Sequence, residues 1–153
     1  MRIVLLSKQS HQIFVQNIPE MMQKNNRPFA SISFQVQGVL WLIPLRSFIK
    51  HKYAFLYPHM NKEDKGKGMK KGLDFTKAVA VDQSVTYTPI NIPQAEFKFY
   101  QKNINVVKKK FVAHLKKVRK AMDKPDVPAH QNLLRYTTLK SFQTAIDQTL
   151  SPS

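Results

Sequence analysis

The sequence predicts an α+β fold, in which a small antiparallel sheet curled into a barrel comes first and helices follow it. Two observations support this class. In the N-terminal part, short apolar segments alternate with polar residues or run unbroken, as strands do. After Pro93 the spacing of apolar residues changes from two to about 3.6, as in helices. A chain of 153 residues with 42% hydrophobic residues fits one domain, and we expect residues 1–153 to form it.

The N-terminal segment predicts one strand and two short helices. Residues 1–6, MRIVLL, predict a strand, and Ser7 is a suitable N-cap for a polar helix that covers His11 to Gln16. Pro19 and Glu20 suit the first turn of another helix that ends near residues 24–26. The apolar run is too short for a signal peptide, and no stretch approaches the roughly 18 apolar residues of a membrane span. We therefore expect a cytoplasmic protein.

Residues 27–45, RPFASISFQVQGVLWLIPL, predict a β-hairpin. Polar and apolar residues alternate from Phe29 to Gln37, Gly38 breaks the run, and the apolar VLWLI follows as a more buried strand. Phe34 and Trp41 fall on the apolar positions of these strands, so we expect both in the core.

Residues 57–72 predict a flexible basic loop, because they hold all but one of the four glycines and show no apolar period. The segments LDFTKAVAV and VTYTPINI predict two further strands, and Pro89 places the second at a sheet edge.

Residues 94–150 predict helices. Phe97 and Tyr100 fit a short first helix, and Pro125 and Pro128 end the helix that follows it. Thr138 is a candidate N-cap for the last helix. The long helix in the middle carries one apolar stripe of Ile104, Val107, Phe111, Leu115, Val118 and Met122.

The charge predicts a polyanionic partner. A net charge of +16, from 25 Lys and Arg against 9 Asp and Glu, opposes compaction through self-repulsion. Nucleic acid ranks before an anionic membrane surface, because the cations do not accompany a long apolar stretch or a Trp- and Leu-rich amphipathic face. The chain has no Cys, and its five His residues are far apart, so we expect neither a metal site nor a cofactor.

Two segments concentrate the positive charge. Residues 108–120, KKKFVAHLKKVRK, place cations around the apolar stripe of the long helix, and no acid occurs between Glu96 and Asp123. A solvated face usually mixes signs, so this run favours contact with a nucleic-acid backbone. The second segment, IPLRSFIKHKY at residues 43–53, adds cations where an apolar strand ends.

Ser47 and His51 are the candidates for chemistry in this second segment. A hydroxyl among Arg46, Lys50 and Lys52 can orient a phosphate, although a turn serine with solvated lysines has the same sequence. His51 can act as a general acid or base near neutral pH, or it can be an incidental surface residue. The rings at positions 53, 55, 57 and 87 are candidates for stacking on unpaired bases, whereas Phe111 is expected in the core with Phe34 and Trp41.

The stretches RPFASISFQVQGVLWLIPLRSFIKHKYAF, GLDFTKAVAV and YTPINIPQAEF, followed by the basic helix, resemble the endoribonuclease toxins of type III toxin–antitoxin systems. This is the ToxN, AbiQ and TenpN group, and the sequence around RSFIKHKY is most similar to the TenpN branch. The similarity runs from about Arg27 to Lys120 in one order, and YTTLKSFQTAI is similar to the final helix of the family.

The resemblance implies a strongly curved β-barrel with added helices, related to the MazF and CcdB toxins. It implies phage defence by metal-independent cleavage of cellular or phage RNA, in which the 2′-hydroxyl is the nucleophile. The products are a 2′,3′-cyclic phosphate and a 5′-hydroxyl. The implied inhibitor is an antitoxin RNA, a small folded repeat RNA that the toxin processes and binds along a basic groove, in some cases as a cyclic toxin–RNA assembly.

The resemblance also implies roles for single residues. Ser47 matches a serine needed for activity, Arg27 matches a cation at the scissile phosphate, and Lys50 or Lys52 matches a basic residue beyond the serine. Arg46 stands where the family often has a second hydroxyl. The catalytic candidates are Ser47, Arg27, Lys50 and His51, with the general base unassigned. The RNA-binding candidates are Arg46, Lys52, Tyr53, Thr76, Lys77, Lys108, Lys109, Lys116 and Arg119, of which Thr76 and Lys77 follow Phe75 in an RNA-facing FxK motif of the family.

Two alternatives share this composition. A nonenzymatic RNA-binding protein needs the same cations and rings, and a DNA-binding regulator is disfavoured because no helix-turn-helix pattern occurs between the strands. Cleavage requires Ser47 and Arg27 to face one concave site.

Overall fold

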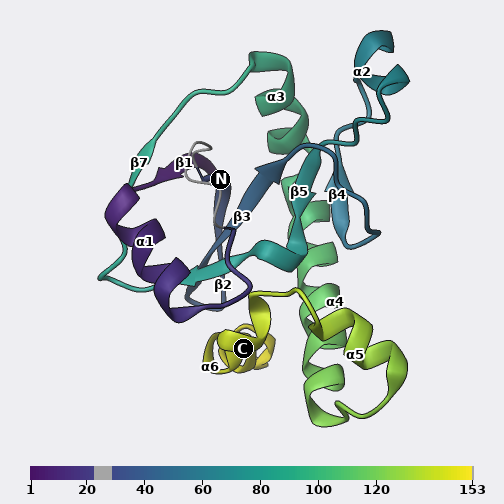
Figure 1. Ribbon diagram of the computed structural model, residues 1–153. Coiled ribbons are helices and arrows are strands. Elements are labelled where there is room, and N and C mark those ends of the chain that lie inside the picture. Colours follow the sequence, from purple (N-terminus) through teal and green to yellow (C-terminus); the bar gives the residue numbers. More distant parts are fainter. Residues whose placement is uncertain (23–28, 153) are drawn as a thin grey trace.

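The computed structural model describes residues 1–22 and 29–152 and confirms the α+β class (Figure 1). The strands are β1 (Arg2–Leu6), β2 (Ala30–Val36), β3 (Val39–Arg46), β4 (Ala54–Leu56), β5 (Gly72–Asp74), β6 (Val79–Val81) and β7 (Tyr87–Pro89). The α-helices are α1 (Lys8–Asn17), α2 (Lys62–Gly66), α3 (Gln94–Lys102), α4 (Ile104–Asp123), α5 (Pro128–Leu134) and α6 (Gln143–Leu150). Two 3-10 helices are η1 (Phe75–Lys77) and η2 (Leu139–Ser141).

All strand pairs in the described part of the chain are antiparallel and form one sheet in the order β4-β5-β3-β2-β1-β7. β3 is the central strand, because β2 pairs with one of its edges while β6 and β5 pair with successive parts of the other. The sheet does not close into a barrel among these residues, so the α+β prediction is confirmed and the barrel is not. β7 is a terminal strand, as Pro89 predicts.

The predicted hairpin is confirmed. β2 and β3 pair up to Val36 and Val39, and the two residues between them both have positive φ, 51° at Gln37 and 78° at Gly38. Two consecutive residues in this region form the tight turn whose twist matches that of the flanking strands.

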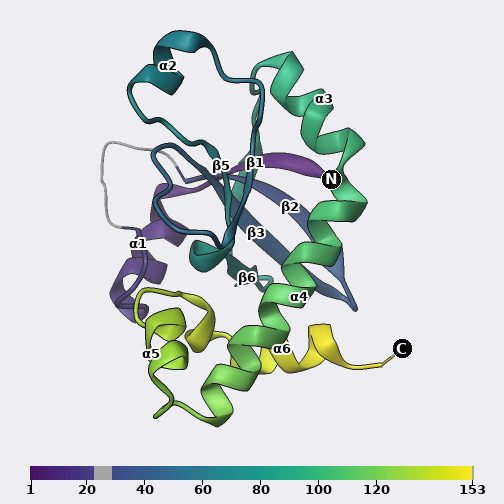
Figure 2. The ribbon, with the colours of Figure 1, turned by 90° about the vertical axis from the view of Figure 1, so that its right-hand side faces the viewer.

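Helices cover both faces of the sheet, and Figure 2 shows α4 running across one of them. The buried stripe of α4 packs on this face, where the rings of Trp41 and Phe111 meet edge to face at 5.2 Å between centroids. The Trp41 indole N–H donates to Thr149 Oγ1 at 2.9 Å and so connects β3 to α6. On the opposite face, Val4 and Leu42 pack with residues of α1. Phe34, Trp41 and Phe111 are all buried, as predicted.

The capping predictions have different outcomes at the two ends of the chain. Ser7 accepts a hydrogen bond from Ser10 N–H at 3.1 Å and caps α1, as predicted. Thr138 is not the cap of the last helix, because its hydroxyl is buried and donates to Ala78 O. Pro19 and Glu20 form a turn, and the rest of the helix predicted to end near residues 24–26 lies outside the described residues.

Two predicted segments differ from the structure. The strand predicted over residues 73–81 is two short strands separated by η1, because the Asp74 carboxylate accepts the Thr76 N–H and starts a helical turn. The loop predicted over residues 57–72 contains the short helix α2, which Asn61 caps. In the described part of the chain, no helix has the length and apolar character needed to span a bilayer.

Candidate functional site

The buried carboxylate of Asp74 organises the candidate site. Asp74 Oδ2 accepts a hydrogen bond from Arg46 Nη1 at 2.5 Å, and Oδ1 accepts both the N–H and the hydroxyl of Thr76 at 2.9 and 2.6 Å. His51 Nε2 lies 3.0 Å from Oδ1 but lacks the alignment of a good hydrogen bond. Two of the predicted site residues, Arg46 and His51, therefore converge on one carboxylate.

Asp74 is fully buried and remains ionised in the folded protein. Burial alone would raise its pKa, but the neighbouring side chains of His51, Thr76 and Arg46 together lower the pKa of Asp74 to about 2. A charged carboxylate inside the protein holds the polar side chains around it in fixed positions. Asp74 therefore acts on the orientation of Arg46 and His51.

Neither ring nitrogen of His51 is available to a substrate. Nδ1 accepts the backbone N–H of Tyr53 at 3.0 Å, and the buried Nε2 faces Asp74. A histidine that transfers a proton to a substrate needs one nitrogen within reach of it. In this arrangement His51 supports the loop between β3 and β4 through its bond from Tyr53 N–H, and neither ring nitrogen is placed to transfer a proton to a substrate.

His114 of α4 also packs against the ring of Tyr53. The ring centroids of Tyr53 are 5.9 Å from those of His51 and 5.3 Å from those of His114, which also packs on Phe75 at 5.8 Å. Burial and the charge of Lys117 lower the pKa of His114 to about 4, and its Nε2 is buried without a hydrogen-bond partner among the described atoms. His114 is therefore a neutral imidazole at pH 7, placed behind the site.

Arg46 also lines a small cavity on the other side of the strand exit. This cavity, of about 200 Å³, brings together Ser47, Lys71, Glu96 and Tyr100. Lys71 Nζ pairs with the Glu96 carboxylate. Ser47 is exposed, whereas burial, with the charge of Glu96 adding to it, raises the pKa of the Tyr100 phenol. The cavity thus combines a free hydroxyl, two cations and one carboxylate.

The close approach of β4 to β5 depends on Gly72. A Cβ at this position would lie 2.2 Å from Phe55 O, which is far inside van der Waals contact. Gly72 also pairs with Arg46 of β3. The glycine therefore lets three strands meet at the point where the site residues leave the sheet.

The basic face of α4 gathers three of the predicted RNA-binding residues. Lys108, Lys109 and Lys116 line a shallow cavity of about 490 Å³ with Gln35 at the end of β2. Within the described ranges, no lysine of α4 takes part in an ion pair, whereas Arg119 pairs with Asp123 and Asp147. The lysines remain available for an external anion, and Arg119 is held by α6.

The other predicted residues have distinct surroundings. Arg27 lies outside the described residues. Thr76 is buried against Asp74, and Lys77 donates to Glu20 O and Tyr136 O at 2.7 and 2.6 Å, so both stabilise η1. Lys50 and Lys52 are exposed on the loop that contains His51, and Lys52 Nζ lies 5.6 Å from the centre of the Tyr53 ring.

Sequence reasoning missed Asp74, Glu96 and His114. Asp74 is one of only nine acids in the chain and interrupts an apolar segment, which is a signal for a buried charge with partners. His114 follows Phe111 by three positions and so belongs to the inward stripe of the helix. Glu96 gives no signal in the sequence, because its partner Lys71 is distant along the chain.

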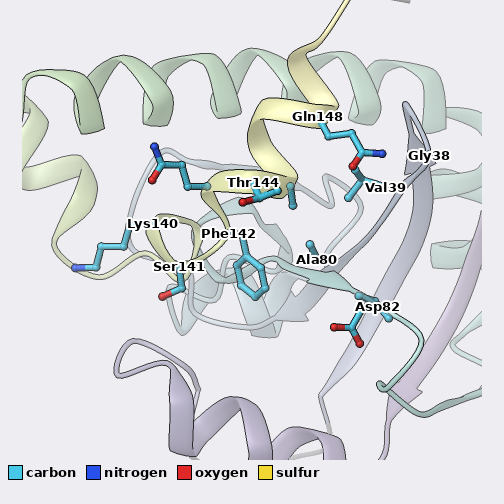
Figure 3. Close-up of a pocket in the computed structure, with 12 residues that line it drawn as sticks. Gly38, Val39, Ala80, Asp82, Lys140, Ser141, Phe142, Thr144 and Gln148 are labelled. Atoms are coloured by element: carbon cyan, nitrogen blue, oxygen red, sulfur yellow. The ribbon is translucent and has the colours of Figure 1, made fainter.

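A cavity larger than the one at Ser47 lies elsewhere. It measures about 600 Å³ and lies between the hairpin turn, β6 and the η2–α6 segment (Figure 3). Figure 3 shows Gln148 extending from α6 toward Gly38 and Val39 of the hairpin. Of the candidate catalytic residues that the structure describes, Ser47, Lys50 and His51, none lines it.

No protein-family model, curated protein or solved structure matches the chain. In the described part of the chain, no group of three or more His, Asp or Glu side chains is arranged to hold a metal ion. The resemblance to type III toxins therefore rests on the sequence stretches quoted above.

Proposed function

We propose that the protein is a metal-independent endoribonuclease toxin of a type III toxin–antitoxin system. The observation that supports this most strongly is the position of Arg46, which joins the buried Asp74 to the cavity that Ser47 lines. An anchored guanidinium beside a free hydroxyl is suited to hold a phosphate in one orientation. The net charge of +16 supplies the attraction for RNA.

The phosphate site consists of the Ser47 hydroxyl, Arg46 and the cations around them. Arg46 uses Nη1 for Asp74, and its other N–H donors can reach a phosphate oxygen. Its side chain is 32% exposed, so a ligand has access to it. Lys50 lies further along the same exposed loop and adds positive charge.

The reaction is an internal phosphoryl transfer. A base takes the proton of the 2′-hydroxyl, the oxygen attacks the adjacent phosphorus, and the bond from phosphorus to the 5′-oxygen breaks. The leaving oxygen takes a proton, so the products are a 2′,3′-cyclic phosphate and a 5′-hydroxyl. Glu96 is the carboxylate that lines the same cavity as Ser47, which makes it the candidate base, with Lys71 as the adjacent proton donor.

The basic face of α4 is the proposed surface for the RNA backbone. Lys108, Lys109 and Lys116 contact phosphates of the substrate or of the antitoxin RNA, which occupies the surface and blocks cleavage. A cyclic assembly forms when each RNA bridges two protein copies.

A nonenzymatic RNA-binding protein is the second candidate. The surroundings of His51 favour it, since Nδ1 accepts a backbone N–H and Nε2 is buried against Asp74, which leaves no accessible imidazole nitrogen beside the phosphate site. Its basic face would bind RNA in the same way, and the RNA would stay intact.

Ser47→Ala tests the proposal. Removing one hydrogen-bond donor that stabilises the transition state typically lowers the rate of the chemical step by about 10² to 10³. Affinity for an uncleavable 2′-O-methyl RNA of the same sequence should stay near that of the wild type, because the cations remain. Ser141→Ala is the matched control, since Ser141 is also exposed and lines the distant cavity of Figure 3. Equal cleavage rates for both variants would remove Ser47 from the site.

A further inference from the structure

The strand exit beside the candidate site contains a β-bulge. Arg46 pairs with Gly72, and Ile49 N–H donates to Lys70 O at 2.9 Å. Between these two links, the chain after β3 has Ser47 and Phe48, whereas the segment before β5 has only Lys71. Two residues therefore face one, which defines a bulge.

The bulge turns an aromatic side chain outward. Phe48 has φ of 59°, in the left-handed region that favours glycine, and it is 45% exposed. The next residue, Ile49, is only 4% exposed. A large apolar residue at this position has an unfavourable backbone conformation and an exposed side chain. Bulges beside active sites re-aim side chains, and local strain there indicates a role in function.

The surroundings of Phe48 are polar and cationic. Ser47 before it lines the proposed phosphate cavity, and Lys50 after it is exposed. Among the described residues, neither Lys50 nor Lys70 forms an ion pair. A partner for this surface must therefore present negative charge and a flat apolar face together. Unpaired nucleotides do so, because each base lies beside a phosphate.

We propose that Phe48 is the platform on which one unpaired nucleobase stacks, next to the phosphate held by Arg46 and Ser47. This inference rests on the proposed function and adds a substrate requirement to it. The nucleotide beside the scissile bond has to be single-stranded, since a paired base cannot offer its face to the ring. Stacking sets the position of the RNA, and the base itself is recognised by shape.

Substitution of the ring tests the platform directly. The probe is a short single-stranded 2′-O-methyl oligonucleotide, which binds without being cleaved. Phe48→Leu keeps the backbone strain and apolar character but removes the ring, and it should weaken binding roughly 5- to 100-fold. Phe48→Tyr should bind like the wild type. Tyr136→Leu is the matched control, because Tyr136 is 64% exposed and lies on another part of the chain.

Fluorescence gives a second readout that does not depend on activity. The natural Trp41 is fully buried, so the indole introduced by Phe48→Trp reports contact with the RNA. Its emission should be quenched by the single-stranded probe and not by the matched duplex. Abasic sites are then introduced into the probe one position at a time. At one position the abasic site should abolish the quenching of Phe48→Trp. With the probe that is abasic at this position, Phe48→Leu and the wild type should bind equally well.

Three results would overturn the inference: equal affinity of Phe48→Leu and wild type, quenching by duplex RNA as strong as by single strands, or no dependence on any one base. A loss of self-association in Phe48→Leu with unchanged RNA affinity would reassign the ring to a protein interface. Failure of the proposed function would give a different result. Unmodified RNA would then stay uncut, while Phe48 would still stack on the 2′-O-methyl probe.

Discussion

Replacing Asp74 by Asn should remove the electrostatic anchor of the site while keeping the shape of the side chain. Asp74 is fully buried and accepts bonds from Arg46 and Thr76, with His51 at 3.0 Å. An uncharged amide leaves the Arg46 guanidinium without its partner. Breaking a buried pair from one side costs about 3 to 5 kcal/mol, and the partial exposure of Arg46 places the expected loss at the lower end.

The pH dependence of this loss follows from the pKa of Asp74. The value falls from 3.8 to about 2 on folding, and one pKa unit corresponds to about 1.4 kcal/mol. The lowered pKa therefore contributes about 2 kcal/mol to the free energy of unfolding. Because the folded-state pKa is the lower one, this contribution is complete above pH 4 and disappears as the pH falls through 2.

Urea unfolding from pH 7 to pH 2 measures both quantities, with the fluorescence of the buried Trp41 as the signal. The difference in unfolding free energy between wild type and Asp74→Asn should shrink by about 2 kcal/mol over the acid range. Asp126→Asn, at an exposed position, is the control and should change little. A variant as stable as the wild type at pH 7, with the same acid dependence, would refute the role of Asp74.

Three further predictions concern the surroundings of the site. The wild type should lose stability as the pH falls from 6.5 to about 4, because the folded-state pKa of His114 lies below its unfolded value, and His114→Leu should remove this loss. Urea unfolding of both proteins at several pH values measures it. Equal slopes of unfolding free energy against pH would show that His114 is solvated. Gly72→Ala should destabilise the fold strongly, since its Cβ would lie 2.2 Å from a backbone oxygen, whereas Gly66→Ala, which meets nothing within 4 Å, should be neutral or slightly stabilising in thermal unfolding. The pair Lys109→Gln and Lys116→Gln should reduce the salt dependence of RNA binding by about 0.7 per lost contact, and an unchanged slope would remove this face of α4 from the interface.

The parts of the fold that depend on local pattern could be predicted from the sequence. The β2–β3 hairpin follows from alternation and Gly38, the α4 stripe from its spacing, and the first cap from Ser7. The interruption at Asp74 could not be predicted, because the aspartate is stable there only with Arg46, which is distant in sequence. Closure of the sheet depends in the same way on contacts between distant edge strands, and the predicted barrel is not confirmed.

The candidate site was predicted in part, for a similar reason. The sequence indicates a phosphate site at Ser47, and the structure places Arg46 beside it in one cavity. The sequence gives no means to see that Nε2 of His51 is buried against Asp74, since Asp74 belongs to another strand. Glu96 comes to Ser47 only because α3 lies beside the first residue of β5 at this cavity. Charged residues that are distant in the sequence and meet only in the tertiary structure show no characteristic spacing along the chain.

Mapping the ends of RNA cut in the presence of EDTA tests the central claim most directly. The proposed internal transfer predicts that the purified wild-type protein cuts single-stranded RNA with the chelator present and leaves 2′,3′-cyclic phosphate and 5′-hydroxyl ends. Ser47→Ala should give the same ends about 10² to 10³ times more slowly. RNA that stays bound and intact would contradict the claim in favour of a binding protein, and cleavage that stops with EDTA and returns with magnesium would contradict the metal-independent mechanism.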